Sequence, residues 1–226
     1  MIHIVKRVSV MRKKQLPVKT LERLILYKRL LSDAQKDGQQ TVYSHQLAQL
    51  AGNSAVQVRR DLMQIGFTGS PRNGYVIKDL VQAIEKTLNN PYKQKMILVG
   101  VGNLGKAILT YFTCQQPLFN LVAAFDNDPN KVNRVIGGCR CFPLEKLDEL
   151  VKQEQIKLAI LTVPAFEAQN LANKLIYLGI KGILNFAPVT LKVPDSVICE
   201  QMDIMLQLEK LAFLTQQKDE VNYAKV

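Results

Sequence analysis

The fold follows from one glycine-rich segment, Met96-Ile97-Leu98-Val99-Gly100-Val101-Gly102-Asn103-Leu104-Gly105. It joins an apolar run, typical of a buried strand, to a GxGxxG glycine pattern, and residues 106–112 continue as a helix. Gly100 allows the tight turn, Gly102 lets a pyrophosphate approach backbone N–H groups at the helix N-terminus, and Gly105 lets helix and strand pack closely. The stretch therefore predicts a dinucleotide-binding unit.

A second strand and a carboxylate follow at the spacing that such a unit requires. Residues 121–125 form the strand, and Asp126 stands twenty-one residues after Gly105, where a carboxylate accepts hydrogen bonds from the adenosine ribose. Asp126 and Asp128 would repel a 2′-phosphate, so the sequence favours NAD(H) over NADP(H). The expected cofactor-binding residues are Gly100, Val101, Gly102, Asn103, Leu104, Gly105, Asp126, Asn127, Lys131, Thr162, Val163, Pro164, Asn185, Phe186 and Ala187.

Alternating strands and helices extend this domain over residues 93–199. Apolar patterns predict helices over 144–152 and 165–178 and strands over 156–163 and 182–186. The fold class is therefore α/β, with a Rossmann-like doubly wound parallel sheet. The loops at 162–164 and 185–188 should face the nicotinamide half of the cofactor, although core packing explains Phe186 equally well.

The sequence before this domain is markedly basic. Residues before Tyr92 contain 15 Lys and Arg against 6 Asp and Glu, a formal charge of +9, whereas the remainder carries only +2 of the total +11. A compact basic domain attracts phosphate backbones through counterion release. Nucleic acid is therefore the first partner to expect. An anionic membrane surface could use the same charge, but no apolar run reaches the roughly eighteen residues of a membrane span. We expect a soluble, cytoplasmic protein.

Residues 16–90 have the order of elements of a winged helix-turn-helix. A helical period over 16–31 is followed by a short extended segment, a helix over 46–50 that Ser44 would cap, and a helix over 55–63 that Ser54 would cap. Val56, Leu62 and Ile65 are expected to face inward, as in a recognition helix. The glycine-rich residues 66–77 predict a hairpin wing, residues 79–88 a closing helix, and Asn89-Asn90-Pro91 a linker.

Double-stranded DNA is the partner that this pattern favours. Arg59-Arg60-Asp61 alone would also fit a solvated helix face with a local ion pair, but within a recognition helix DNA contact is the better interpretation. The expected DNA-binding residues are Arg23, Ser54, Gln57, Arg59, Arg60 and Arg72.

The two ends of the sequence carry different signals. Residues 1–15 form a basic leader that we expect to be disordered, with an arm in the minor groove as the alternative. Residues 200–216 contain a helix that is apolar around much of its circumference and needs burial on several sides. Packing on its own domain and insertion into a partner subunit are both open.

The sequence contains no clear pattern for a metal site or for a catalytic site. The cysteines and histidines lack metal-ligand spacing, and Cys139-x-Cys141 fits unpaired thiols better than a redox pair. The nucleotide-binding domain contains no histidine. Tyr177 and Lys181 have the spacing of a dehydrogenase dyad, but Gly179 should end the helix between them. We expect no metal site and no enzymatic activity.

The combined motifs resemble those of the Rex family of redox-sensing transcriptional repressors. The resemblance covers residues 16–214 and rests on five motifs: Gln57-Val58-Arg59-Arg60-Asp61-Leu62, the glycine turn at 100–105, Ala124-Phe125-Asp126-x-Asp128-Pro129, Thr162-Val163-Pro164 and residues 182–189. It implies a homodimer that binds a palindromic operator when free or with NAD⁺ and leaves it when NADH binds as a signalling ligand. It also implies a C-terminal helix swapped between subunits.

The same resemblance implies three switch residues, Arg29, Tyr111 and Asp203, which would link the DNA-binding domain, the cofactor and the swapped helix. An interdomain salt bridge without a sensing role is the alternative for them. Two other functional classes also stay open: an NAD-dependent oxidoreductase fused to a basic module, and a transcription factor that senses another nucleotide or a CoA-type ligand.

Overall fold

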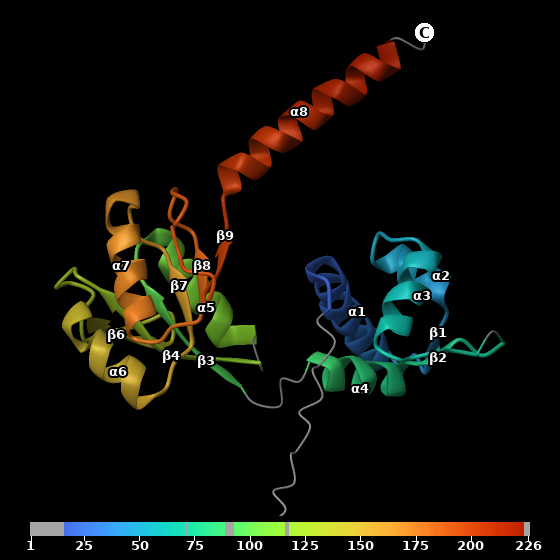
Figure 1. The fold of residues 1–226 in the computed structure, drawn as a ribbon, viewed down its shortest axis with the longest axis horizontal. Coiled ribbons are helices and arrows are strands. Elements are labelled where there is room, and N and C mark those ends of the chain that lie inside the picture. Colours follow the sequence, from blue (N-terminus) through green and yellow to red (C-terminus); the bar gives the residue numbers. More distant parts are fainter. Residues whose placement is uncertain (1–15, 71, 89–92, 116–117, 224–226) are drawn as a thin grey trace, which may run out of the picture. The chain divides into compact units, whose positions relative to one another are not determined.

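The computed structural model describes residues 16–70, 72–88, 93–115 and 118–223 (Figure 1). The chain divides into two compact units, Met1–Pro91 and Tyr92–Val226, and each has its own hydrophobic core. The predicted leader and the Asn89-Asn90-Pro91 linker lie outside the described residues. None of the helices in the described part is long and apolar enough to cross a bilayer.

The first unit has the predicted order of elements. These are α1 (Val18–Lys36), β1 (Thr41–Val42), α2 (Ser44–Leu50), α3 (Ala55–Gln64), β2 (Tyr75–Val76) and α4 (Ile77–Leu88). Ser54 caps α3 as expected, since its Oγ accepts a hydrogen bond from Gln57 N at 3.1 Å. The prediction for Ser44 was wrong: α2 begins there, and the capping residue is Tyr43, whose N–H donates to the Gln46 side chain at 2.8 Å.

The core of this unit fixes which side of α3 faces inward. Val58 and Leu62 are fully buried and pack with Leu24 and Leu47 from the preceding helices. Val56 was predicted to face inward, but it is 49% exposed. The residues that face inward are Val58, Leu62 and the half-buried Ile65. Because successive residues of a helix are about 100° apart, Val56 points away from the face that Val58 and Leu62 share.

The predicted wing is present as a small antiparallel arrangement. β2 pairs with β1, with Thr41 opposite Val76 and Val42 opposite Tyr75. Ser70 and Gly74 form an antiparallel bridge with backbone hydrogen bonds of 2.9 and 2.8 Å, which closes the tip. Tyr43 fastens the tip to the helix-turn-helix, because its OH donates to the Arg72 carbonyl at 2.8 Å.

The second unit is built on a seven-stranded sheet of order β5-β6-β4-β3-β7-β8-β9. The strands are β3 (Gln94–Val99), β4 (Phe119–Asp126), β5 (Val135–Ile136), β6 (Cys139–Pro143), β7 (Leu158–Leu161), β8 (Gly182–Asn185) and β9 (Ile198–Gln201). All pairs are parallel except β5 with β6. β5, β6 and β9 were not predicted, because these short outer strands have little apolar pattern.

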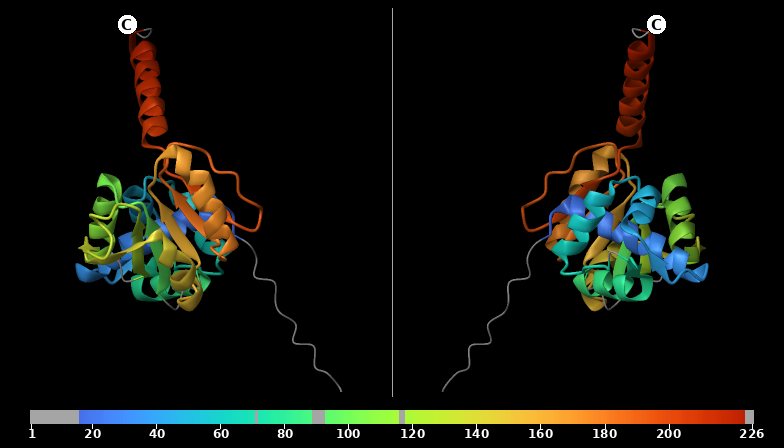
Figure 2. Two further views of the ribbon diagram at one scale, coloured as in Figure 1. Left: turned by 90° about the vertical axis from the view of Figure 1, so that its left-hand side faces the viewer. Right: turned by 90° about the vertical axis from the view of Figure 1, so that its right-hand side faces the viewer.

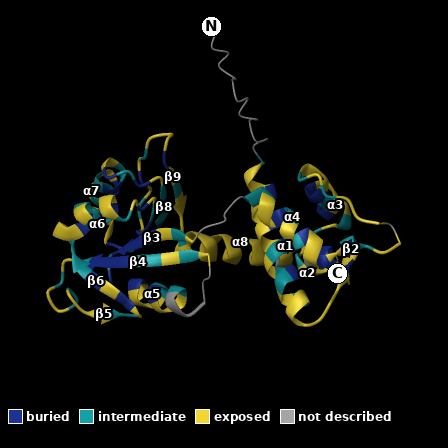
Figure 3. Cartoon of the chain, turned by 90° about the horizontal axis from the view of Figure 1, so that it is seen from below, coloured by how far each residue is buried: buried dark blue, intermediate teal, exposed yellow. Residues whose placement is uncertain are grey.

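Helices cover both faces of the sheet, as a doubly wound fold requires (Figure 2). One face packs against α6 (Leu147–Gln153), which follows the 3₁₀ turn Leu144–Lys146, and α7 (Ala165–Tyr177). The other face packs against α5 (Asn103–Gln115) through residues such as Leu109 and Phe112. Residues 96–99 of β3 and 123–125 of β4 are buried (Figure 3), as are residues 159–161 of β7.

The last helix, α8 (Ile204–Tyr223), has no such cover. Every side chain from Ile204 to Lys218 is exposed, including Met205, Leu208 and Phe213 (Figure 3). The structure therefore does not pack α8 on its own domain. Its exchange between subunits stays a prediction.

Candidate functional site

The glycine turn between β3 and α5 has the geometry that its sequence predicts. Gly100 has a φ of +98°, and a Cβ there would lie 2.5 Å from the Thr162 carbonyl oxygen. A Cβ on Gly105 would collide with the Gly100 carbonyl oxygen. No atom lies within 4 Å of the Cβ position of Gly102, so the backbone there is open to a pyrophosphate. The turn fits a dinucleotide.

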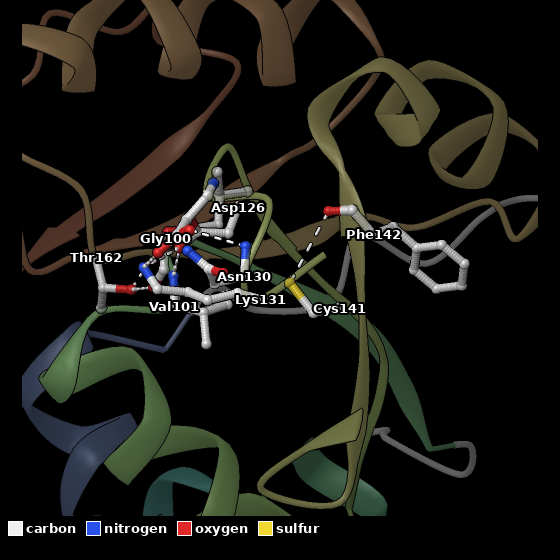
Figure 4. A network of polar contacts seen from close by, with 10 residues as sticks. Gly100, Val101, Asp126, Asn130, Lys131, Cys141, Phe142 and Thr162 are labelled. Carbon is white, nitrogen blue, oxygen red and sulfur yellow. Dashed lines mark hydrogen bonds and ion pairs between the residues drawn. The ribbon is translucent and has the colours of Figure 1, made fainter. Parts of the chain in front are cut away.

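Asp126 ends β4 directly beside this turn (Figure 4). One carboxylate oxygen accepts from Val101 N at 2.7 Å and Lys131 Nζ at 3.2 Å, and the other accepts from Asp128 N at 2.8 Å. Burial alone would raise the pKa of Asp126, but these hydrogen bonds outweigh it and lower the pKa. A carboxylate has about four acceptor positions, so Asp126 retains one for a ribose hydroxyl.

Lys131 lies between the two carboxylates of this region. Its Nζ is 3.2 Å from Asp126 and 3.5 Å from Asp128. Partial burial opposes the charged amine, but the two carboxylates outweigh this and raise the pKa of Lys131. The three side chains together carry one negative charge, which still disfavours a 2′-phosphate. Asn127 is exposed next to them.

The loops after β7 and β8 lie at the same edge of the sheet as the glycine turn, because β7 pairs in parallel with β3 and β8 pairs in parallel with β7. Thr162 is committed to the turn, since its Oγ1 donates to the Gly100 carbonyl at 2.6 Å. Val163 and Ala187 are buried, whereas Pro164 is exposed. Phe186 packs against the α5-side core, which agrees with the core interpretation of this residue.

Asn185 does not present its side chain to a ligand. It is fully buried, and its amide bonds with Ala187, Val189 and Gln201. In this structure the Asn185 side chain holds the following loop, and the predicted contact of this residue with the cofactor stays a prediction. Sequence reasoning missed Gln201, because no motif marks it.

On the recognition helix, Arg59 and Arg60 are exposed, as predicted. Arg59 Nη1 donates to Ser44 Oγ at 2.9 Å, which directs the guanidinium along the start of α2. Arg72 is exposed at the wing, and Ser54 is exposed at the start of α3. These side chains offer a charged, accessible surface of the kind that contacts phosphates and base edges.

Asp61 does not fit the alternative interpretation of this motif as a solvated helix face with a local ion pair. Its side chain is fully buried, and its carboxylate accepts two hydrogen bonds from Arg23, at 2.6 and 2.7 Å. Tyr27 OH at 3.1 Å and Gln57 Nε2 at 2.9 Å donate to the same carboxylate. Burial would raise the pKa of Asp61, but Arg23, Gln57 and Tyr27 outweigh it and lower the pKa.

This arrangement changes the roles expected of Arg23 and Gln57. The Arg23 guanidinium, 22% exposed, anchors α1 to the recognition helix, and the Gln57 amide is oriented by the same carboxylate. Contact of either side chain with DNA stays a prediction. Sequence reasoning missed the anchor because Arg23 and Asp61 are thirty-eight residues apart.

The proposed switch residues are all accessible within their own units. Arg29 is exposed on α1, and Tyr111 is 55% exposed on α5. Asp203 accepts a hydrogen bond from Leu206 N at 2.9 Å and so caps α8. Their network stays a prediction.

Other reactive groups are held in structural roles. Cys139 and Cys141 are buried free thiols; burial raises the pKa of Cys139 to about 11 and also raises that of Cys141, which favours the neutral thiol over the reactive thiolate. Tyr177 ends α7 and is 86% exposed, and Gly179, with a φ of +98°, separates it from Lys181. Among the described residues no cluster of His, Cys, Asp and Glu could hold a metal ion.

Comparisons with known proteins agree with this geometry. A family model described as putative DNA-binding protein N-terminus matches residues 15–62, and one described as CoA binding domain matches residues 91–189. The redox-sensing transcriptional repressors Rex of Carboxydothermus hydrogenoformans and Desulfitobacterium hafniense are both 39% identical over 199 residues. These alignments span 88% of this chain and 96% and 95% of those proteins.

Solved structures show the same architecture. RSP, a Rex-family repressor, matches with a TM-score of 0.81 and 29% identity over 95% of this chain and all of RSP. RSP in complex with β-NAD⁺ and operator DNA matches with a TM-score of 0.83, 30% identity and coverage of 94% and 98%. RSP in complex with β-NADH gives a TM-score of 0.80, 30% identity and coverage of 93% and 99%.

Fold and site define the class of protein: a winged-helix domain of DNA-binding type joined to a Rossmann-type nucleotide-binding domain. Identity to curated relatives over nearly their whole length narrows this class further. The chain belongs to the Rex family of redox-sensing transcriptional repressors.

Proposed function

We propose that this protein is a transcriptional repressor that senses the NADH/NAD⁺ ratio. As a homodimer in the cytoplasm, it binds a palindromic operator when free or with NAD⁺ and is released by NADH. The observation that carries the proposal is the presence in one chain of exposed Arg59 and Arg60 on an anchored recognition helix and of a glycine turn, with Asp126 beside it, that fits a dinucleotide. The RSP complexes with operator DNA and with both forms of the cofactor support it.

The residues of the nucleotide-binding domain divide the recognition of the cofactor among them. Gly102 and the N-terminus of α5 bind the pyrophosphate, and Asp126 with Lys131 binds the adenosine ribose. The nicotinamide half lies beside the loops at residues 162–164 and 185–188, where the buried Val163 and Ala187 make the surroundings apolar. The oxidised ring carries a positive charge that the reduced ring lacks, so an apolar lining favours NADH by avoiding a buried charge.

Release of the repressor from its operator then requires only NADH binding and no chemical reaction of the cofactor. If NADH prefers a dimer whose recognition helices no longer match successive major grooves, its binding shifts the population away from DNA. A change from mostly bound to mostly free requires roughly 3 to 5 kcal/mol of differential affinity. We propose that NADH is not consumed, since Tyr177 and Lys181 do not share a helical face and the domain contains no histidine.

A CoA-type ligand is the second candidate, because the CoA binding domain model matches residues 91–189. Asp126 and Asp128 argue against it, since the adenosine ribose of CoA carries a phosphate that these carboxylates would repel. The same argument separates NAD(H) from NADP(H).

Operator binding measured with NAD⁺, with NADH and with neither tests the proposal. We expect binding in the first and third cases and release by NADH, with the NADH absorbance constant throughout. Binding that ignores NADH but responds to CoA would establish the second candidate, and a steady fall in absorbance would establish an oxidoreductase.

A further inference from the structure

The last residues of β8 and β9 form a polar pair at the edge of the sheet that carries the glycine turn. Asn185 and Gln201 are register partners in the parallel ladder between these two strands. Asn185 Nδ2 donates to Gln201 Oε1 at 2.7 Å and to the Val189 carbonyl at 2.8 Å. The two side chains therefore form one unit at the point where the loop after β8 begins.

The side chains of Asn185 and Gln201 bind both backbone polar groups of Ala187, its N–H and its carbonyl. Ala187 N donates to Asn185 Oδ1 at 3.0 Å, and the Ala187 carbonyl accepts from Gln201 Nε2 at 2.9 Å. Ala187 is 1% exposed, so water is not available as a substitute partner. The Ala187 carbonyl also accepts from Val189 N at 2.7 Å within the same loop. A shift of the Ala187 backbone relative to Asn185 and Gln201 therefore breaks two buried hydrogen bonds, which is costly unless the two side chains move with it.

The connection continues into α8. Met202 N donates to the Asn185 carbonyl at 2.8 Å, and Asp203, the next residue, caps the first turn of α8 through its hydrogen bond from Leu206 N. Only Met202 and Asp203 separate Gln201 from the helix. Hydrogen bonds and the two-residue segment 202–203 thus link the loop at residues 186–189 to the start of α8.

We propose that Gln201 is a positioning residue that couples the nicotinamide-side loop to α8. The inference rests on the proposed function, which places the nicotinamide beside the loop after β8. A ligand that displaces the Ala187 backbone displaces Gln201 with it and changes the direction in which α8 leaves the sheet. Gln201 itself touches neither the cofactor nor DNA in this proposal.

Gln169 provides a matched control within the same domain. It too is a glutamine that holds a loop backbone: its Nε2 donates to the Lys192 carbonyl at 3.0 Å, and its Oε1 accepts from Lys192 N at 2.9 Å. Its side-chain partners are Lys192 and Asn173, so it braces a loop without a link to α8. A purely structural contribution of such a glutamine would be similar at both positions.

The test uses the full-length protein and measures the coupling ratio, defined as the operator dissociation constant at saturating NADH divided by that without ligand. For Gln201→Met we expect this ratio to fall by about fivefold or more, because coupling energies between sites are typically of this size. The NADH affinity of the free protein and its operator affinity without ligand should stay within about twofold of the wild type. Gln169→Met should leave all three quantities unchanged.

Three results would overturn the inference. The first is a coupling ratio in Gln201→Met equal to that of Gln169→Met. The second is a loss of NADH affinity with an intact ratio, which would make Gln201 a support of the binding loop only. The third is a wild-type ratio of one, which would refute the proposed function itself and is recognised before any variant is made.

Gln201→Glu keeps the inference testable if Gln201→Met does not fold. A glutamate retains the acceptor for Asn185 Nδ2 but loses the donor to the Ala187 carbonyl. We expect the same fall in the coupling ratio, and a ratio equal to that of the wild type would contradict the role given to the contact with Ala187.

Discussion

In the winged-helix unit, the recognition helix is anchored by a buried ion pair between Asp61 and Arg23, whereas in the nucleotide-binding unit the glycine turn is defined by backbone atoms in close contact. The first arrangement depends on charge and on the presence of both partners. The second depends on the absence of a Cβ at Gly100 and Gly105. The two sites should therefore fail under different substitutions, and each prediction below separates them.

The largest loss of unfolding free energy is expected from Gly100→Ala. The new methyl group would meet the Thr162 carbonyl in a backbone conformation that alanine avoids, so we expect the nucleotide-binding unit to lose about 4 kcal/mol of unfolding free energy. Thermal and denaturant unfolding measure this loss. Gly102→Ala is the control: its space is open, so stability should change by less than about 0.5 kcal/mol while NADH affinity falls by about tenfold or more. Equal stability of the two variants would contradict the close-contact argument.

Asp61→Ala should destabilise the winged-helix unit. Removal of one partner of a buried ion pair leaves the Arg23 charge uncompensated; because Arg23 is 22% exposed, we expect about 3 kcal/mol, the lower end of the usual range. Operator affinity should fall with the stability of this unit, while NADH binding is retained. Asp33→Ala removes the exposed ion pair with Lys36 and should cost less than about 0.5 kcal/mol. A similar cost for both variants would show that burial of Asp61 has no energetic weight.

Asp126→Ala should impair the response to NADH and leave operator binding by the free protein within about twofold of the wild type. Loss of a charged acceptor for the ribose should weaken NADH binding by about 2 kcal/mol, which is roughly thirtyfold. Titration of the operator complex with NADH measures the shift. Asp148→Ala, which removes an ion pair with Lys174 in the same domain, is the control. An unchanged release curve for Asp126→Ala would refute the ribose contact.

The smallest loss of stability is expected when the pH is lowered. The pKa of Asp61 is lowered in the folded protein, so its contribution to stability is complete above its unfolded value of about 4 and is lost as the pH falls through the lower folded value. The winged-helix unit should therefore become less stable below about pH 4. Asp61→Asn should be less stable than the wild type at neutral pH, and the difference should shrink as the pH falls. A difference that is constant with pH would contradict the ionised state of the buried carboxylate.

The glycine turn shows how much of a site the sequence predicts. Gly100, Gly102 and Gly105 stand in the geometry that their spacing indicated, because the requirement for a positive φ or for the absence of a Cβ belongs to the residue itself. The order of helices in the winged-helix unit was also predictable, since capping residues and apolar periods are local signals.

Contacts between distant residues were not predictable in this way. Asp61 looked like a solvated residue because its partner Arg23 lies on another helix, and Asn185 looked like a ligand-binding residue because its partner Gln201 lies on a strand that has no sequence signature. Val56 and Val58 are both apolar, and only the packing of α3 on the core selects Val58 for burial.

The two domains, their order and the glycine turn were predictable from short segments, because backbone conformation and periodicity are local properties of the chain. Only the tertiary structure decided that Asp61 anchors the recognition helix and that Asn185 and Gln201 join a loop to α8. The physical reason is that a buried polar group must find its partner in space, and the chain order does not state where that partner is.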